Sequence, residues 1–237
     1  KEALALLKEI NKEARIGKWV DVYPRKEIRY RTGVSLKEIN QLLGSSYTKE
    51  QVESVFTRLC FPYEEVVPEE TIKKTIDTVL GKPYKHGASV RFDAPNMFDC
   101  SSLSSWLYSL VGVAIPRVSI DQYVYGESVT ALQYGDLLFA NTHQGNVHFK
   151  TLHYMAGTEV KEGIDHVGIY MDAGKVLHAT RTKGQVVIES ISENPVFKNI
   201  VGYKRVLHTL EEKRYVITVP NERLDIRIKE DLIEEVG

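Results

Sequence analysis

The sequence predicts an α+β protein, with amphipathic helices and antiparallel strands in separate stretches of one chain of 237 residues. Two observations support this fold class. The segment LSSWLYSLVG at 103–112 repeats its apolar residues at helical spacing. The segments HVGIYM at 166–171 and KVLHAT at 175–180 instead alternate as strands do, with an Asp-Ala-Gly turn between them. We therefore expect a helix packed on an antiparallel hairpin.

The first helices are predicted from their capping signals. The segment SLKEINQLLG at 35–44 begins with a capping box, Ser35 with Glu38, and ends at Gly44. A second capping box opens the segment TKEQVESVFTRLCF at 48–61, whose apolar residues again follow helical spacing. Both segments are predicted helices.

The remaining elements suggest how the chain is organised. We expect a strand at 60–67, a helix at 69–80, a strand at 214–220 and the start of a helix at 224–237. The two strands would pair as a hairpin, although most of the chain lies between them. The tip of a hairpin is exposed and tolerates an inserted domain whose own ends are adjacent.

This pattern predicts three parts. Residues 1–24 would end a preceding domain or linker. Residues 25–67 plus 209–237 would form a small, discontinuous α+β host domain, and residues 68–208 would form the domain inserted into it.

The segment FDCSS at 98–102 places Cys100 just before the central helix. The exposed amides at a helix N-terminus favour a thiolate, so we expect the Cys100 pKa to lie below the ordinary value of about 8.5. His166 and His178 lie on the two strands of the hairpin, which can hold both imidazoles on one face. Taken singly, a residue such as Cys100, His166 or His178 more often has a structural role. Buried cysteines are usually inert, and strand histidines are usually hydrogen-bonded core residues or surface residues.

The combination of motifs is more specific than any one of these residues. Five segments occur in one order: GKPYKHG at 81–87, FDCSS at 98–102, IPRVSIDQY at 115–123, GDLLF at 135–139 and DHVGIY at 165–170. In this order they resemble the NlpC/p60 family of papain-like cysteine peptidases over about residues 69–208. The resemblance implies a papain-like fold, with helices packed on an antiparallel sheet.

The resemblance also implies catalytic roles. Cys100 would be the nucleophile, His166 the general base and His178 the residue that orients this base. The implied reaction is acyl transfer, in which the thiolate attacks an amide or ester carbonyl and water then resolves the thioacyl enzyme. In this family the usual bond is a γ-D-glutamyl amide of a cell-wall peptide.

Three further residues match the family's substrate site. Tyr84 would line it and help bind the oxyanion, beside the backbone amide of Cys100. Asp99 and Ser101 match positions that bind a free substrate amine in some members. Ser102 replaces the usual glycine of the DCSG motif, and we expect it to crowd the start of the helix.

The segment 141–164 is longer than the family's usual link, and we expect a flap or hairpin beside the cleft. It contains His143, His148 and His153 at five-residue spacing. This spacing matches no common zinc motif and no helix face, so exposed loop histidines are the better interpretation. We predict no metal and no cofactor.

Composition is that of an ordinary globular protein, with 43% hydrophobic and 27% charged residues. A net charge of −1 gives no global argument for nucleic-acid or membrane binding, and no apolar run is long enough to span a bilayer.

Two cysteines rule out a disulfide framework and suit a reducing compartment. We expect Cys60 to be a small buried residue without a role. The chain begins at Lys1 rather than Met, so we expect a fragment.

The flanks resemble a second family. The order I-x-x-LLG, a helix ending RL-x-F, then V-x-VP-x-x-R-x-DI and EDLIEEV resembles the B5 domain of the bacterial phenylalanyl-tRNA synthetase beta chain. Residues 1–24 resemble the stretch before that domain. The resemblance implies a cytoplasmic protein, with tRNA and the synthetase alpha subunit as partners. A generic winged-helix-like α+β module is the alternative.

We therefore predict a fragment of a synthetase beta chain that carries a cysteine peptidase or amidase in its B5-like host domain. The two resemblances disagree on compartment, because wall peptides lie outside the cytoplasm. Two alternatives stay open. One is a non-catalytic insert kept for binding or spacing, and the other is a stand-alone cell-wall peptide hydrolase.

Overall fold

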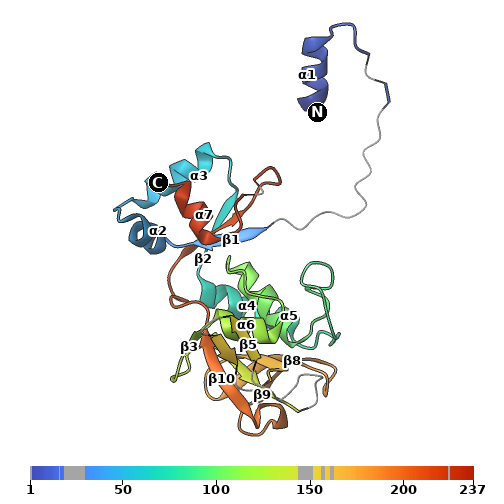
Figure 1. The fold of residues 1–237 in the computed structure, drawn as a ribbon, viewed down its shortest axis with the longest axis vertical. Helices are drawn as coiled ribbons and strands as arrows, with labels where there is room; N and C mark the ends of the chain where they lie inside the picture. The colour runs from blue at the N-terminus through green and yellow to red at the C-terminus, as the bar shows by residue number, and fades with distance from the viewer. Residues whose placement is uncertain are drawn as a thin grey trace.

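The computed structural model of this protein describes residues 2–15, 17–18, 30–143, 152–155, 158–160, 163–223 and 225–237. In these ranges the helices are α1 (Glu2–Ile10), α2 (Leu36–Leu43), α3 (Lys49–Arg58), α4 (Pro68–Val79), α5 (Cys100–Leu110), α6 (Ser119–Tyr125), the 3-10 turn η1 (Pro195–Phe197) and α7 (Lys229–Glu234). The strands are β1 (Arg31–Val34), β2 (Tyr63–Val66), β3 (Glu127–Ser128), β4 (Leu137–Ala140), β5 (Leu152–Met155), β6 (Thr158–Val160), β7 (His166–Tyr170), β8 (Lys175–Thr180), β9 (Gln185–Ser190), β10 (Ile200–Arg205) and β11 (Arg214–Thr218). The predicted α+β class is confirmed (Figure 1).

The larger sheet has the strand order β3-β10-β4-β7-β8-β9, and its neighbouring strands are antiparallel. β7 and β8 form the predicted hairpin, with Asp172 and Ala173 of the turn at positive φ. Helix α5 packs against this hairpin. Its apolar face buries Leu103, Leu107 and Val111, as the helical spacing predicts.

The smaller sheet has the order β1-β11-β2. β2 and β11 pair antiparallel, with Tyr63 opposite Ile217 and Val66 opposite Arg214, so the predicted pairing of these distant segments is confirmed. Helices α2, α3 and α7 contribute to a separate apolar core on this sheet, which includes Ile39, Phe56 and Leu232. Both predicted capping boxes are present, at α2 and at α3.

Two backbone contacts join the smaller sheet to the larger part of the molecule. The amide of Gly33 in β1 donates to the carbonyl of Gly112, just beyond α5, at 2.8 Å. The amide of Glu69 in α4 donates to the carbonyl of Leu210 at 3.0 Å. The approach at the glycines is so close that a Cβ on Gly112 would lie 2.4 Å from the Gly33 Cα. The division into a host and an inserted domain itself stays a prediction.

Several expectations need correction. Cys60, just past the end of α3 and with φ of 55°, is exposed rather than buried. β1 was not predicted, and it lies at the edge of the smaller sheet. The predicted helix over 224–237 is shorter, since α7 begins only at Lys229.

None of the described helices is long and apolar enough to cross a membrane.

In the segment 141–164, β5 and β6 pair antiparallel, which confirms the predicted hairpin. His148 lies outside the described residues, and the side chain of His153 is not described. At the ends of this segment, Thr142 and Ile164 line the same cavity as Cys100.

Candidate active site

Cys100 occupies the first position of α5, and the start of this helix is tightly capped. Asp99 is the N-cap, and its carboxylate accepts from the Ser102 amide at 2.8 Å. The Ser102 hydroxyl in turn accepts from the Asp99 amide at 2.8 Å. The serine that replaces the usual glycine therefore completes a capping box instead of crowding the helix, which corrects that expectation.

Arg117 ties together two residues that the sequence placed in the substrate site. Its guanidinium donates to the Asp99 carboxylate at 2.5 Å and to the Ser101 hydroxyl at 2.8 Å. A third bond, at 3.0 Å, reaches the carbonyl of Ala88. Asp99 and Ser101 are thus already engaged in holding the loop before α5. No role for Arg117 follows from the sequence, although this residue lies inside the segment 115–123, because its partners are distant in sequence.

His166 and His178 lie on β7 and β8, with the Nε2 atom of His166 2.8 Å from the Nδ1 atom of His178. The two rings meet edge to face, with centroids 5.1 Å apart. Phe197 of η1 packs against both rings. Gly168 lies on β7, two residues after His166, and its lack of a side chain leaves room for Phe197. A Cβ on Gly168 would lie 2.8 Å from the Phe197 ring.

His178 also contacts a carboxylate, that of Glu189, which was not predicted from the sequence. The Nε2 atom of His178 lies 3.0 Å from Oε2 of Glu189 on β9. Oε2 also accepts from the Asn194 side-chain amide at 2.6 Å. The pairing of β8 with β9 puts Val187 opposite His178. Glu189 therefore lies diagonally across from His178, and on the same face of the sheet.

The thiol and His166 meet at one cavity of about 730 Å³, which is also lined by Tyr84 and Arg117. The Cys100 sulfur lies 4.0 Å from the carbonyl oxygen of Asp165, the residue directly before His166. Six residues predicted to form the site all lie at this cavity or directly behind it: Tyr84, Asp99, Cys100, Ser101, His166 and His178.

The electrostatics of the thiol differ from the expectation. Burial, followed by the neighbouring Asp99 carboxylate, raises the pKa of Cys100 to about 11. Hydrogen bonds from the backbone amides of Val167 and Ser101 and the charge of Arg117 oppose this rise. The predicted lowering of the Cys100 pKa is therefore wrong, because desolvation outweighs the amides of the helix start.

The base and the phenol are also uncharged at neutral pH. Burial, with a smaller contribution from His178, lowers the pKa of His166 to about 3. Burial, followed by Cys100 and Asp99, raises the pKa of Tyr84 to about 12, so its hydroxyl keeps the proton it would donate. The cavity thus holds a neutral thiol, a neutral imidazole and a phenolic donor.

Within the part of the chain that the structure describes, no three His, Cys, Asp or Glu side chains are grouped to hold a metal ion. His143 is one of the three histidines considered for such a site. Its Nε2 atom lies 3.3 Å from the side-chain amide of Asn199.

Comparison with known proteins supports the resemblance for the central part of the chain. The model of the NlpC/P60 family matches residues 81–205. A probable endopeptidase of Corynebacterium glutamicum is 37% identical over 120 residues, which cover 50% of this chain and 46% of the relative. The murein DD-endopeptidase MepH of Escherichia coli is 34% identical over 134 residues, covering 54% and 42% respectively.

Two other matches extend this group. The γ-D-glutamyl-L-lysine dipeptidyl-peptidase of Bacillus subtilis is 28% identical over 164 residues, covering 65% of this chain and 49% of the relative. The crystal structure of an NlpC/P60 family protein from Bacillus cereus covers 58% of this chain and 39% of its own, with 27% identity and a TM-score of 0.46.

The chain thus spans about half the length of the curated relatives it matches. Their names are those of peptide hydrolases. None of them lends support to the predicted synthetase host, and the interpretation as a wall-peptide hydrolase agrees with them better.

Proposed function

This chain belongs to the NlpC/P60 family, and we propose that it is a cysteine hydrolase that cleaves a peptide amide bond through an acyl-enzyme on Cys100. One observation carries the proposal. The thiol and His166 line one cavity, and the Nε2 atom of His166 is occupied by His178. The other ring nitrogen, Nδ1, is therefore the one available to take the thiol proton.

The first half of the reaction follows from these neutral groups. The Cys100 sulfur attacks the carbonyl carbon as its proton passes to Nδ1 of His166, because a thiol with a raised pKa needs base assistance. The Cys100 amide, which has no acceptor within its own helix turn, and the Tyr84 hydroxyl stabilise the oxyanion. His166 then gives its proton to the leaving amine, the C–N bond breaks, and a thioester remains.

The second half restores the enzyme. Water replaces the amine in the cavity, and Nδ1 of His166 takes one of its protons as the oxygen attacks the thioester carbonyl. The C–S bond breaks, the carboxylic acid leaves, and the proton returns to the Cys100 sulfur. His178 holds the His166 ring throughout, through the bond of 2.8 Å.

For the substrate we propose a γ-D-glutamyl-type amide of a wall peptide. The name of the B. subtilis relative supports this class. Recognition of a free substrate amine by Asp99 and Ser101 is part of the same proposal. Asp99 already binds Arg117, so the amine would have to share a carboxylate that is partly neutralised.

The test is hydrolysis of L-Ala-γ-D-Glu-L-Lys, followed by mass spectrometry, with the α-linked L-Glu isomer as substrate control. We expect cleavage by the wild type, none by Cys100→Ala or His166→Ala, and a smaller loss in His178→Ala, since an orienting group is partly replaceable. Cys60→Ser is the matched control and should behave as wild type. A protein that binds the γ-linked peptide but neither cleaves it nor forms a thioester would establish the non-catalytic alternative.

The synthetase context is a separate prediction. Binding of tRNA or of a synthetase alpha subunit would support it, and the proposed cytoplasmic location depends on it. A wall-peptide substrate points instead to a compartment outside the cytoplasm. The chemistry proposed for Cys100 depends on neither outcome.

A further inference from the structure

We infer that Glu189, held by Asn194, is a positioning residue that selects the tautomer of His178 and, through it, the tautomer of His166. The inference rests on the proposed function, because it assigns the protonation state that His166 needs as a base. It adds to the cysteine and two histidines a carboxylate on a third strand.

The three side chains form a diagonal line across neighbouring strands. β7 pairs with β8 so that Ile169 lies opposite Leu177, and the same register brings Gly168 opposite His178. His166 is two residues from Gly168 and therefore shares its face. One diagonal step leads from His166 to His178, and an equal step leads from His178 to Glu189.

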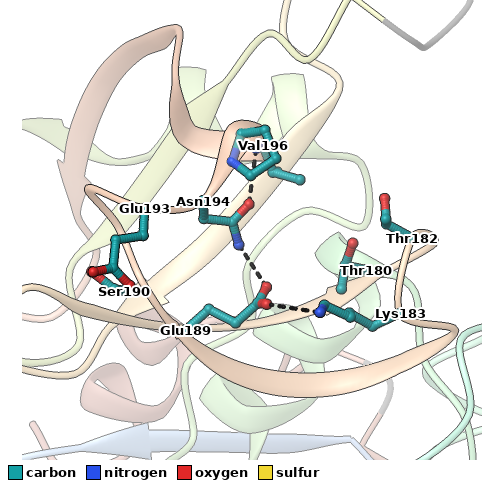
Figure 2. Close-up of a pocket in the computed structure, with 9 residues that line it drawn as sticks. Thr180, Thr182, Lys183, Glu189, Ser190, Glu193, Asn194 and Val196 are labelled. Atoms are coloured by element: carbon teal, nitrogen blue, oxygen red, sulfur yellow. Dashed lines mark hydrogen bonds and ion pairs between the residues drawn. The ribbon is translucent and has the colours of Figure 1, made fainter.

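Glu189 is itself fixed in place (Figure 2). Asn194 donates to its Oε2 atom at 2.6 Å, while the Asn194 carbonyl oxygen accepts from the Val196 amide at 2.9 Å. On the other side, Lys183 lies 3.8 Å from Oε1. Oε2 is thus held toward His178. Glu189 also lines a cavity of about 450 Å³ that shares Thr180, Thr182 and Val196 with the catalytic one.

The hydrogen bonds favour one arrangement of protons. The Nε2 atom of His178 lies 3.0 Å from the Glu189 carboxylate and at the longer distance of 3.4 Å from the Asn194 amide, so the carboxylate is its closer partner. A carboxylate only accepts, so the Nε2 atom of His178 must carry a proton and donate it to Glu189. Neutral His178 then has an unprotonated Nδ1, which accepts from Nε2–H of His166. Neutral His166 consequently has an unprotonated Nδ1, and this is the atom that must accept the thiol proton.

Without the carboxylate, this order is no longer imposed. His178 could then carry its proton on Nδ1 and donate to Nε2 of His166 across the same 2.8 Å. The proton of His166 would move to Nδ1, and the base would be blocked. His178 is fully buried and packed by Phe197, and only the cavity that Glu189 lines could admit water to the vacated place. Water can donate as well as accept, so it would not impose the tautomer that the carboxylate imposes.

The test combines kinetics with ¹⁵N NMR of the histidine rings in the full chain. In Glu189→Ala we expect kcat to fall about 10- to 100-fold with KM unchanged. This is the range found in metal sites when the hydrogen-bond partner that orients a metal-binding histidine is removed. Glu189→Gln should recover much of the loss, because its side-chain oxygen can accept the same bond. The ¹⁵N signals should show Nε2–H tautomers for both rings in the wild type and a mixture in Glu189→Ala.

Glu193 provides the matched control. It lines the same cavity, and in Figure 2 its side chain reaches toward Ser190 instead of toward the carboxylate of Glu189. Glu193→Ala should keep wild-type kinetics and tautomers. Comparable losses of kcat in the Glu193 and Glu189 variants would mean that both substitutions act by destabilising the protein and not through the tautomers, which would contradict the inference.

Two further results would overturn the inference. One is a wild-type ring spectrum in which His166 carries its proton on Nδ1. The other is a folded Glu189→Ala with unchanged tautomers. Because the spectrum needs no turnover, it decides the matter even if the wild type hydrolyses nothing, which would defeat the proposed function alone. Glu189→Leu, which fills a similar volume but has no acceptor, gives the same reading if the alanine variant does not fold.

Discussion

Cys100 and His166 are kept neutral by burial, and this decides how the chemistry must begin. Because the pKa of Cys100 is about 11 and that of His166 is about 3, both groups are neutral at neutral pH, and forming a thiolate–imidazolium pair before the attack is unfavourable. The proton must therefore move as the sulfur attacks. Helix-terminus amides act on the same thiol, but their effect is smaller than the desolvation.

Alkylation of the thiol tests this base assistance. At neutral pH we expect His166→Ala to slow iodoacetamide labelling of Cys100 by about 10-fold or more, because general bases contribute about 10²-fold or more when they act. Peptide mass mapping over time gives the rate. Exposed Cys60 serves as the internal control, and its rate should not change. Equal Cys100 rates in both proteins would remove His166 as the base.

The buried imidazole also predicts a pH-dependent stability. His166 has a folded-state pKa of about 3 against an ordinary 6.5, so its contribution is fully present above pH 6.5 and is lost as pH falls toward 3. Between pH 7.5 and 5 the wild type should lose about 2 kcal/mol more unfolding free energy than His166→Asn, at about 1.4 kcal/mol per pH unit below 6.5. Urea unfolding at both pH values measures the difference. Parallel losses in the two proteins would show that His166 titrates normally.

At the scale of elements, the position of α5 depends on its two ends. Asp99 and Ser102 cap the start that carries Cys100. Beyond the other end, Gly112 has φ of 73° and meets Gly33 of β1 backbone to backbone. Only glycine combines this conformation with so close an approach. The contact joins the catalytic helix to the smaller sheet.

Gly112→Ala should therefore destabilise the protein by about 3 kcal/mol or more, from backbone strain together with overpacking. Gly44→Ala is the matched control, because Gly44 also has positive φ, 61°, but has no atom within 4 Å of an added Cβ. It should lose only about 1 kcal/mol, from strain alone. Urea unfolding compares the two variants, and similar losses would show that the Gly33–Gly112 approach relaxes readily.

At the scale of the whole molecule, the described residues form separate apolar cores. One lies between the larger sheet and α4 and α5, and another lies between the smaller sheet and α2, α3 and α7. The fully buried residues of each core come from its own part of the chain, while Val66 of β2 and Leu210 pack against the larger core from outside the segment 68–208. β2 and β11 are the strands through which the chain leaves and re-enters the smaller core.

This arrangement makes the predicted insertion testable. Because Val66 and Arg214 are paired, residues 67–213 can be replaced by an Asn-Gly turn, which suits a two-residue hairpin. We expect the shortened chain to fold and unfold cooperatively, since it keeps its own core. The isolated segment 68–208 should do the same. Circular dichroism during thermal unfolding is the measurement, and a disordered shortened chain would mean that the two parts need each other.

Local patterns alone determined several elements of both sheets and their helices. Capping boxes located α2 and α3, alternation located β7, β8 and β11, and the order of motifs brought Cys100 and the two histidines into one site. These signals act over a few residues or depend on side-chain periodicity, so they can be read from the chain itself.

Only the tertiary structure decided what surrounds those groups. Arg117 reaches Asp99 across 18 residues, and Glu189 meets His178 only because β8 and β9 pair in one register. The raised pKa of the thiol likewise depends on burial, which sums contributions from every element packed around it. Residue types and their spacing specify which groups chemistry can use. Their charge, their proton positions and their partners depend on desolvation and strand register, and these exist only once distant segments pack together.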